Sequence, residues 1–108
     1  MIYYIDIDGT ICEDIPMKGK TEATYRAQMP FEERIEEINR LYDQGHEIHY
    51  WTARGATSGK NWTELTTEQL KKWGCKYTAL HMGKPHFDIY ICDKSYNSNQ
   101  YFTQNSYE

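Results

Sequence analysis

The first ten residues constrain the fold more than any other part of the chain. Ile2 to Ile7 are β-branched, aromatic or aliphatic apart from Asp6, and the run contains no Gly or Pro. Such a run predicts a strand buried on both faces, as in the parallel sheet of an α/β protein. Gly9 ends the run, so Asp6 and Asp8 fall at the carboxyl end of the strand, where open α/β sheets bind ligands.

Asp6 and Asp8 are two residues apart on this strand and therefore point to the same side. Two like charges at the end of an apolar strand are unfavourable unless they share a cation or a proton. Mg²⁺ would relieve the repulsion, because this hard cation prefers oxygen ligands. One carboxylate could then act as a nucleophile while the other exchanges protons. A turn-capping role, common for Asp before Gly, would explain Asp8 but not Asp6.

The length and charge of the chain limit its function. A chain of 108 residues fits one domain, and 16 acidic against 12 basic residues give a net charge of −4, which argues against non-specific nucleic-acid binding. Binding of a short nucleic-acid end stays open. The three cysteines cannot all pair within the chain and show no CxxC spacing, which indicates a reducing compartment. No signal peptide or long apolar run is visible, so we expect no membrane contact and a cytoplasmic location.

Strand-like runs and helical periodicity alternate along the rest of the chain. Together they predict one domain over residues 1–108, an α/β fold with a three-layer, Rossmann-like parallel sheet flanked by helices. Later strands are predicted at 46–51, 77–81 and 87–92, and helices at 31–44 and 61–73. Residues 11–30 are expected to form a loop or flap in which 21–29 is a short helix or irregular. The tail after Ser95 is predicted to be a weak helix or to fray over 98–108.

Each later strand is followed by a polar residue that could join the two acids. Thr52 follows the second strand, and its hydroxyl and the N–H groups of the next turn could hold a phosphate oxygen. A capping or turn role explains Thr52 about equally well. Lys84 lies between Gly83 and Pro85, where it could face a charged centre or remain a solvated loop lysine. Asp93 follows the last strand, and three carboxylates suit Mg²⁺.

This arrangement resembles the haloacid dehalogenase-like hydrolases, most of which are phosphatases. The resemblance covers Ile2 to about Asn97. The run from Asp6 to Thr10 matches the first motif of the family, and Thr52 with Ala53 and Arg54 matches the second. Lys84 matches the third motif and Asp93 the fourth.

The resemblance implies a role for each matching residue. Asp6 would attack phosphorus and form an aspartyl-phosphate, and Asp8 would act as acid and then base. Asp6, Asp8 and Asp93 would hold Mg²⁺, Asp8 through its backbone carbonyl. Thr52 and Lys84 would orient and neutralise the phosphoryl group. The remaining matches would contact the substrate, namely Gly9, Thr10, Ala53 and Arg54.

Two features separate this chain from many relatives. Cys92 stands where relatives often have an acid beside Asp93, and a thiol is a poor Mg²⁺ ligand. Residues 11–30 and the single helix-containing crossover are too short for a cap domain, which implies a capless member whose open site a homo-oligomer could cover.

Two further patterns are weak. Gly55 to Lys60 is similar to a P-loop, but only three residues separate its glycines and Asn61 replaces Ser or Thr, so we expect no triphosphate site. This loop could still touch the substrate, because it follows Thr52. The four histidines show no zinc-binding pattern, and His86 could contact the substrate.

The sequence leads to three expectations about function. The first is a Mg²⁺-dependent phosphomonoesterase for a sugar phosphate or similar small phosphorylated metabolite. The second is a non-catalytic binding or regulatory module that keeps the fold. The third is a phosphatase for nucleotides or nucleic-acid ends.

Overall fold

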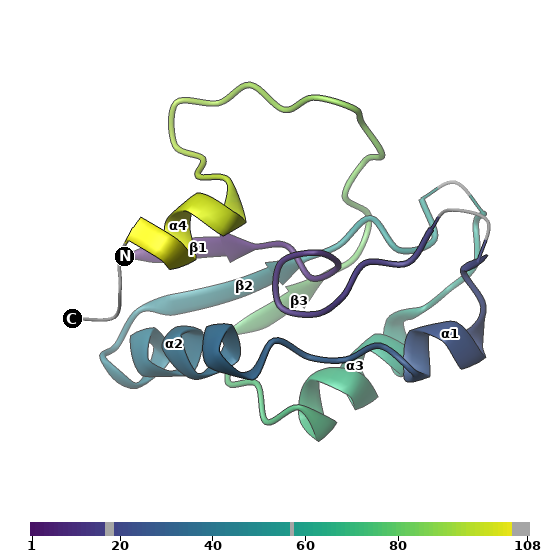
Figure 1. Cartoon of the computed structure of the whole chain (residues 1–108), viewed down its shortest axis with the longest axis horizontal. Helices are drawn as coiled ribbons and strands as arrows, with labels where there is room; N and C mark the ends of the chain where they lie inside the picture. Colours follow the sequence, from purple (N-terminus) through teal and green to yellow (C-terminus); the bar gives the residue numbers. More distant parts are fainter. Residues whose placement is uncertain (17–18, 57, 105–108) are drawn as a thin grey trace.

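The computed structural model describes residues 1–16, 19–56 and 58–104. These residues form a three-stranded parallel sheet and four helices, so the predicted α/β class and parallel sheet are confirmed (Figure 1). The strands are β1 (Ile2–Ile5), β2 (Glu47–Trp51) and β3 (Ala79–His81); the helices are α1 (Glu22–Arg26), α2 (Glu32–Asp43), α3 (Thr63–Lys72) and α4 (Ser98–Gln104). None of the described helices is long and apolar enough to cross a membrane.

The strands follow one another across the sheet in the order β1-β2-β3. The register pairs Tyr4 with His49 and His49 with Ala79. Because all three strands are parallel, their carboxyl ends lie at one edge of the sheet. The residues that follow β1, β2 and β3 are therefore brought together at that edge.

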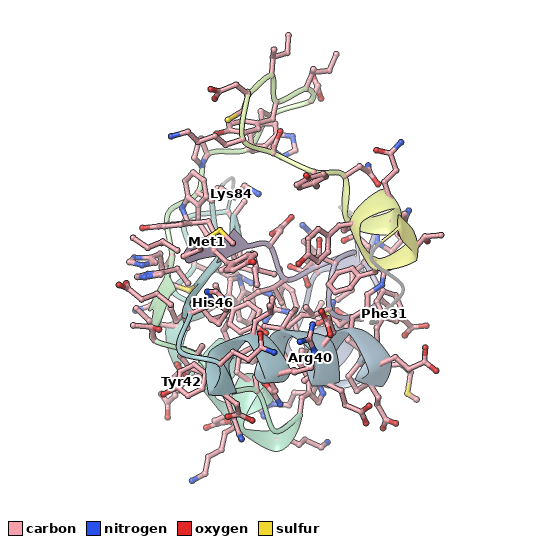
Figure 2. The ribbon with its side chains drawn as sticks, turned by 90° about the vertical axis from the view of Figure 1, so that its left-hand side faces the viewer. Met1, Phe31, Arg40, Tyr42, His46 and Lys84 are labelled. Carbon is pink, nitrogen blue, oxygen red and sulfur yellow. The ribbon has the colours of Figure 1, made fainter. Side chains whose placement is uncertain are left out.

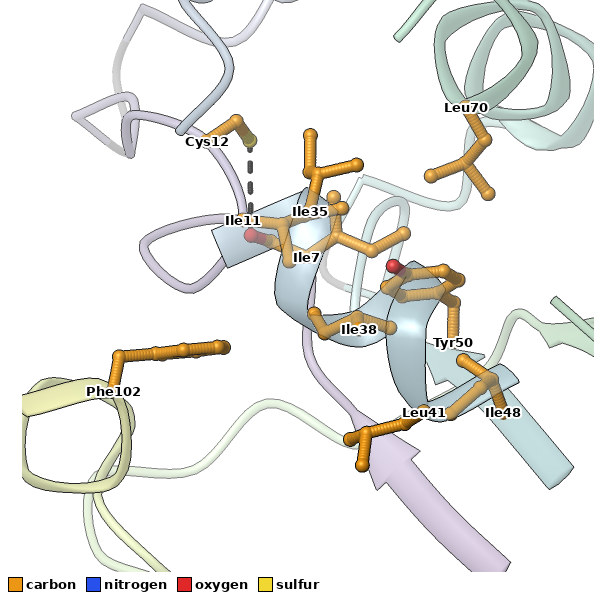
Figure 3. Close-up of a cluster of buried hydrophobic side chains, with 10 residues drawn as sticks. All are labelled: Ile7, Ile11, Cys12, Ile35, Ile38, Leu41, Ile48, Tyr50, Leu70 and Phe102. Atoms are coloured by element: carbon orange, nitrogen blue, oxygen red, sulfur yellow. Dashed lines mark hydrogen bonds between the residues drawn. The ribbon is translucent and has the colours of Figure 1, made fainter. Parts of the chain in front are cut away.

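The hydrophobic core lies between the sheet and the helices. Ile35, Ile38 and Leu41 of α2 form the buried stripe that the helical spacing predicts. They pack with side chains from β2, α3 and the turn after β1, and Figure 3 shows Phe102 pointing from α4 into the same cluster. Gly45 follows the end of α2 and has a φ of +97°, a left-handed conformation that favours glycine.

The three-layer prediction requires helices on both faces of the sheet, and the second face differs from it. Helix α4 lies beside α2, because Arg34 of α2 donates to Asn99 at 2.8 Å and its guanidinium lies 4.8 Å from the Phe102 ring. The rings of Tyr4 and His49 on the opposite face stack on each other, and Tyr4 is 57% exposed. The described residues thus form two layers, and the prediction that the first strand is buried on both faces was wrong.

The predicted fourth strand is also wrong for the described residues. The segment 82–97 arches away from the sheet and returns to it only at α4 (Figure 1). Within it, Phe87 and Tyr90 pack on each other at 5.4 Å, whereas Ile91 is 93% exposed. An extended apolar run becomes a strand only when it pairs with another strand. Here the segment does not pair with the outer edge of β1.

The segment after β1 is more ordered than a simple loop. Thr21 caps α1 with a reciprocal pair of hydrogen bonds to Thr24, so the short-helix alternative holds for this stretch. Residues 17–18 of the expected loop or flap and residues 105–108 of the expected frayed tail lie outside the described residues. The tail up to Gln104 forms α4.

Candidate active site

A cavity of about 600 Å³ opens at the carboxyl edge of the sheet. Its volume falls in the range of small-molecule sites. The residues that line it come from the turn after β1, the loop after β2 and the loop after β3. They are Asp6, Asp8, Asp14, Ile15, Pro16, Lys20, Thr52, Ala53, Arg54, Lys84, Pro85, His86 and Phe87.

Asp6 presents a carboxylate to this cavity. Its side chain is 41% exposed, and Oδ2 lies 3.5 Å from Nζ of Lys84. Its Oδ1 accepts a hydrogen bond from the N–H of Ile7 at 2.8 Å. Burial raises the pKa of Asp6, and the charge of Lys84 only partly offsets it. Asp6 is thus an accessible carboxylate whose negative charge is incompletely compensated.

Asp8 is held by a buried guanidinium. Arg54 has a side-chain exposure of 0%, and its Nη2 and Nε donate to Oδ1 and Oδ2 of Asp8 at 2.9 and 3.0 Å. Gln28 donates a further hydrogen bond to Oδ1 at 2.7 Å. Burial opposes ionisation, but the hydrogen bonds and charge of Arg54 and the bond from Gln28 outweigh it, so the pKa of Asp8 is lowered. Asp8 is therefore an ionised, fixed carboxylate.

The remaining N–H groups of Arg54 also donate within the protein. Nη1 reaches Thr66 and Gln69 of α3 at 3.1 and 2.6 Å, and Nη2 reaches Gln28 at 3.0 Å. The guanidinium lies over the ring of Tyr25, 4.4 Å from its centroid. All five donors of Arg54 are satisfied by protein atoms. We therefore infer that Arg54 positions Asp8. Arg54 has no free donor left for the contact with substrate that the sequence led us to expect.

Thr52 and Lys84 lie on adjoining loops at the same edge. The buried hydroxyl of Thr52 accepts a hydrogen bond from the N–H of Arg54 at 3.2 Å. The carbonyl of Thr52 accepts one from the N–H of Lys84 at 3.1 Å, which ties the two loops together. The ammonium of Lys84, a residue labelled in Figure 2, also lies over the rings of Trp51 and Phe87, 5.4 and 5.3 Å from their centroids. These contacts direct the lysine toward Asp6.

The other expected site residues fall outside the cavity lining. The N–H groups of Gly9 and Thr10 donate to Cys12 and Ile7 in the turn after β1. Asp93 lies within the arching segment 82–97 and is exposed. The structure thus brings Asp6, Asp8, Thr52, Ala53, Arg54 and Lys84 together, but not Gly9, Thr10 or Asp93.

The carboxylates present fit a divalent cation only in part. Among the described residues no three His, Cys, Asp or Glu side chains lie close enough to hold a metal ion. Both oxygens of Asp8 are occupied by Arg54, whereas Asp6 lacks full charge compensation and suits a cation. Asp6 is the side chain here that could bind Mg²⁺, and the expected ligand Asp93 is not beside it.

Several cavity residues were not found by sequence reasoning. Asp14 and Lys20 reach the cavity from the segment after β1, and no motif marks them. Gln28 and Gln69 do not line the cavity but accept hydrogen bonds from Arg54. Gln69 could have been noticed, because it interrupts the apolar face of a predicted helix. A buried amide at such a position requires polar partners, and here those partners are Arg54 and the backbone carbonyl of Tyr25.

Comparisons with known proteins support the fold. The chain is similar to a crystal structure of a structural-genomics target from Vibrio cholerae, with a TM-score of 0.79 and 25% sequence identity. The match covers 96% of this chain and 89% of that one. Comparison with protein-family models found no match, and neither did comparison with curated proteins.

Proposed function

We propose that this protein is a Mg²⁺-dependent phosphomonoesterase that works through an aspartyl-phosphate. The observation that carries the proposal is the accessible, incompletely compensated carboxylate of Asp6, placed in a cavity between Lys84 and the fixed carboxylate of Asp8. An accessible carboxylate is a nucleophile, and phosphoryl transfer otherwise depends on positioning and charge neutralisation. The sugar phosphates and similar small metabolites expected from the sequence remain the substrates we propose.

Each residue contributes a defined step. An oxygen of Asp6 forms a bond to phosphorus as the bond from phosphorus to the ester oxygen breaks, and the departing oxygen takes a proton from water in the open cavity. Lys84 neutralises charge beside Asp6, and the hydroxyl of Thr52 would donate to a phosphoryl oxygen. A second water then attacks phosphorus and gives its proton to Asp8, while the bond from phosphorus to Asp6 breaks and releases inorganic phosphate. The lowered pKa of Asp8 suits this base role better than the acid role that the sequence resemblance also implies.

Mg²⁺ is the cofactor that this chemistry requires. Asp6 and the backbone carbonyl of Asp8 would hold it, and it would supply further charge neutralisation at the phosphoryl group. Asp93 could complete the ligand set if the segment 87–92 paired with the outer edge of β1. The absence of Asp93 from the cavity lining favours the second candidate, a module that binds phosphate esters without turning them over.

The test is hydrolysis of p-nitrophenyl phosphate with Mg²⁺ and with EDTA. This substrate has a leaving group that needs no proton from Asp8. We expect Mg²⁺-dependent turnover in the native chain and a loss of at least about a thousandfold in Asp6→Asn, which removes the nucleophile. Asp14→Asn is the matched control, because Asp14 lines the same cavity without a proposed role; it should retain most of the activity.

Two results would contradict the proposal. Equal activity of Asp6→Asn and Asp14→Asn would exclude Asp6 as the nucleophile. Absence of turnover across a panel of sugar phosphates and nucleotides, in protein that binds them by calorimetry, would establish the non-catalytic module instead.

A further inference from the structure

A second, smaller cavity adjoins the candidate active site. It has a volume of about 130 Å³ and shares Lys20, Ala53 and His86 with the first. Its other walls come from the loop after Arg54 and from the start of α3, including Ser58, Lys60 and Trp62. A molecule bound at Asp6 can therefore extend into this second cavity without leaving the protein surface.

The second cavity is basic in an acidic protein. Lys20 and Lys60 line it, and neither forms an ion pair with a carboxylate in the part of the chain that the structure describes. Lys60 lies 5.7 Å from the centroid of the Trp62 ring, which in turn packs edge-on against Tyr25 at 5.0 Å. The charge of Lys20 also acts on Asp8 and helps to lower its pKa. Two ammonium groups beside one cavity, in a chain of net charge −4, favour an anionic occupant.

Hydrogen bonds join the described residues of the loop that carries Lys60. Gly55 has a φ of +85°, and the N–H of Gly59 donates to its carbonyl at 2.8 Å. A Cβ on Gly55 would lie 2.1 Å from the carbonyl oxygen of Lys60, so the loop closes directly on this glycine. The N–H of Lys60 also donates to the hydroxyl of Ser58 at 3.3 Å. These contacts hold Gly55, Ser58 and Lys60, which line the second cavity, relative to one another.

We propose that the second cavity binds a second anionic group of the substrate. The substrate would then be a phosphomonoester that also carries another phosphate or a carboxylate. Its scissile phosphate lies at Asp6 and Lys84, and its remote anion lies between Lys20 and Lys60. This inference rests on the proposed function for the choice of substrates, but the cavity can be tested by binding alone.

Two matched substrate pairs test the proposal and distinguish the two kinds of anion. Fructose 1,6-bisphosphate is compared with fructose 6-phosphate, and 6-phosphogluconate with glucose 6-phosphate. We expect kcat/KM to favour the doubly anionic member of at least one pair by about tenfold, the ratio that corresponds to about 1.4 kcal/mol. Lys60→Gln should reduce this preference to about twofold or less, mainly through KM. Lys72→Gln, an exposed lysine in the last turn of α3, should leave the preference unchanged.

A binding measurement separates failure of this inference from failure of the proposed function. Fructose 1,6-bisphosphate and 6-phosphogluconate are titrated calorimetrically into the Asp6→Asn chain with and without Lys60→Gln. Weaker binding on loss of Lys60, with no change for Lys72→Gln, would support the second cavity even in a protein without turnover. Equal affinities, or no preference within either substrate pair in an active enzyme, would overturn the inference.

Discussion

Asp6 and Asp8 are two residues apart in the sequence, yet their carboxylates lie in opposite electrostatic environments. Asp6 is partly exposed and has a raised pKa, because burial outweighs the nearby charge of Lys84. Asp8 forms a bidentate pair with the fully buried Arg54, and its pKa is lowered. This contrast supports the proposal that the nucleophile and the base are different residues, Asp6 and Asp8.

The same contrast predicts opposite effects on stability. Asp6→Asn should raise the midpoint of thermal unfolding at pH 7, because it removes a charge that the folded state disfavours. Asp8→Asn should lower the free energy of unfolding by about 3–5 kcal/mol, since it leaves the buried charge of Arg54 without its partner. Thermal and urea unfolding of the two variants measure both effects.

The dependence on pH follows from the signs of the two shifts. Because the pKa of Asp8 is lower in the folded chain, its contribution to stability is present above its ordinary value of 3.8 and is lost as the pH falls through the folded value. The pKa of Asp6 is raised, so its ionisation costs stability above 3.8 and protonation removes that cost. The gain from Asp6→Asn should therefore vanish in acid; a gain that persisted there would point to a cause other than charge.

At the scale of elements, the sequence predicted the two long helices and the three strands of the sheet well. The apolar stripe from Ile35 to Leu41 and the glycines that follow each helix are local signals, and local signals decide such elements. The role of Arg54 could not be predicted in this way. Its partners Asp8, Gln28 and Gln69 are far apart in the chain, and only the fold brings them together.

The segment 87–92 shows the limit of local signals for strands. Its apolar residues predict a strand, but Ile91 is exposed and unpaired in the structure. We expect Ile91→Ser to change the free energy of unfolding by less than about 0.5 kcal/mol, as for other surface positions. Ile38→Ala in the core should cost about 2–5 kcal/mol and serves as the control. A cost for Ile91→Ser similar to that of the control would show that the segment pairs with β1 in solution.

The loop after Arg54 allows a comparison of two glycines. Gly59 has a φ of +72° and open space at its Cβ position, whereas Gly55 combines positive φ with a 2.1 Å approach to Lys60. Gly59→Ala should cost about 1 kcal/mol from backbone strain alone. Gly55→Ala should cost about 3 kcal/mol or more, because the loop must also move. Urea unfolding measures both; equal costs would mean that the loop is not closed on Gly55 as described.

At the scale of the whole molecule, the two faces of the sheet are unequal. One face packs on α2, α3 and α4, and the other carries Tyr4, His49 and His81, whose rings contact one another. His49 is hydrogen-bonded to both His81 and Glu47, at 2.8 and 3.0 Å. The homo-oligomer expected from the sequence stays a prediction, and this partly apolar face is a surface that such an assembly could bury.

The hydrogen-bond network around Arg54 has a consequence for how the site responds to heat. Its members come from the turn after β1, from the residues around α1 and from α3, so separating these segments removes the partners of Asp8. The proposed activity needs this network, so we expect activity and folded structure to be lost together on heating.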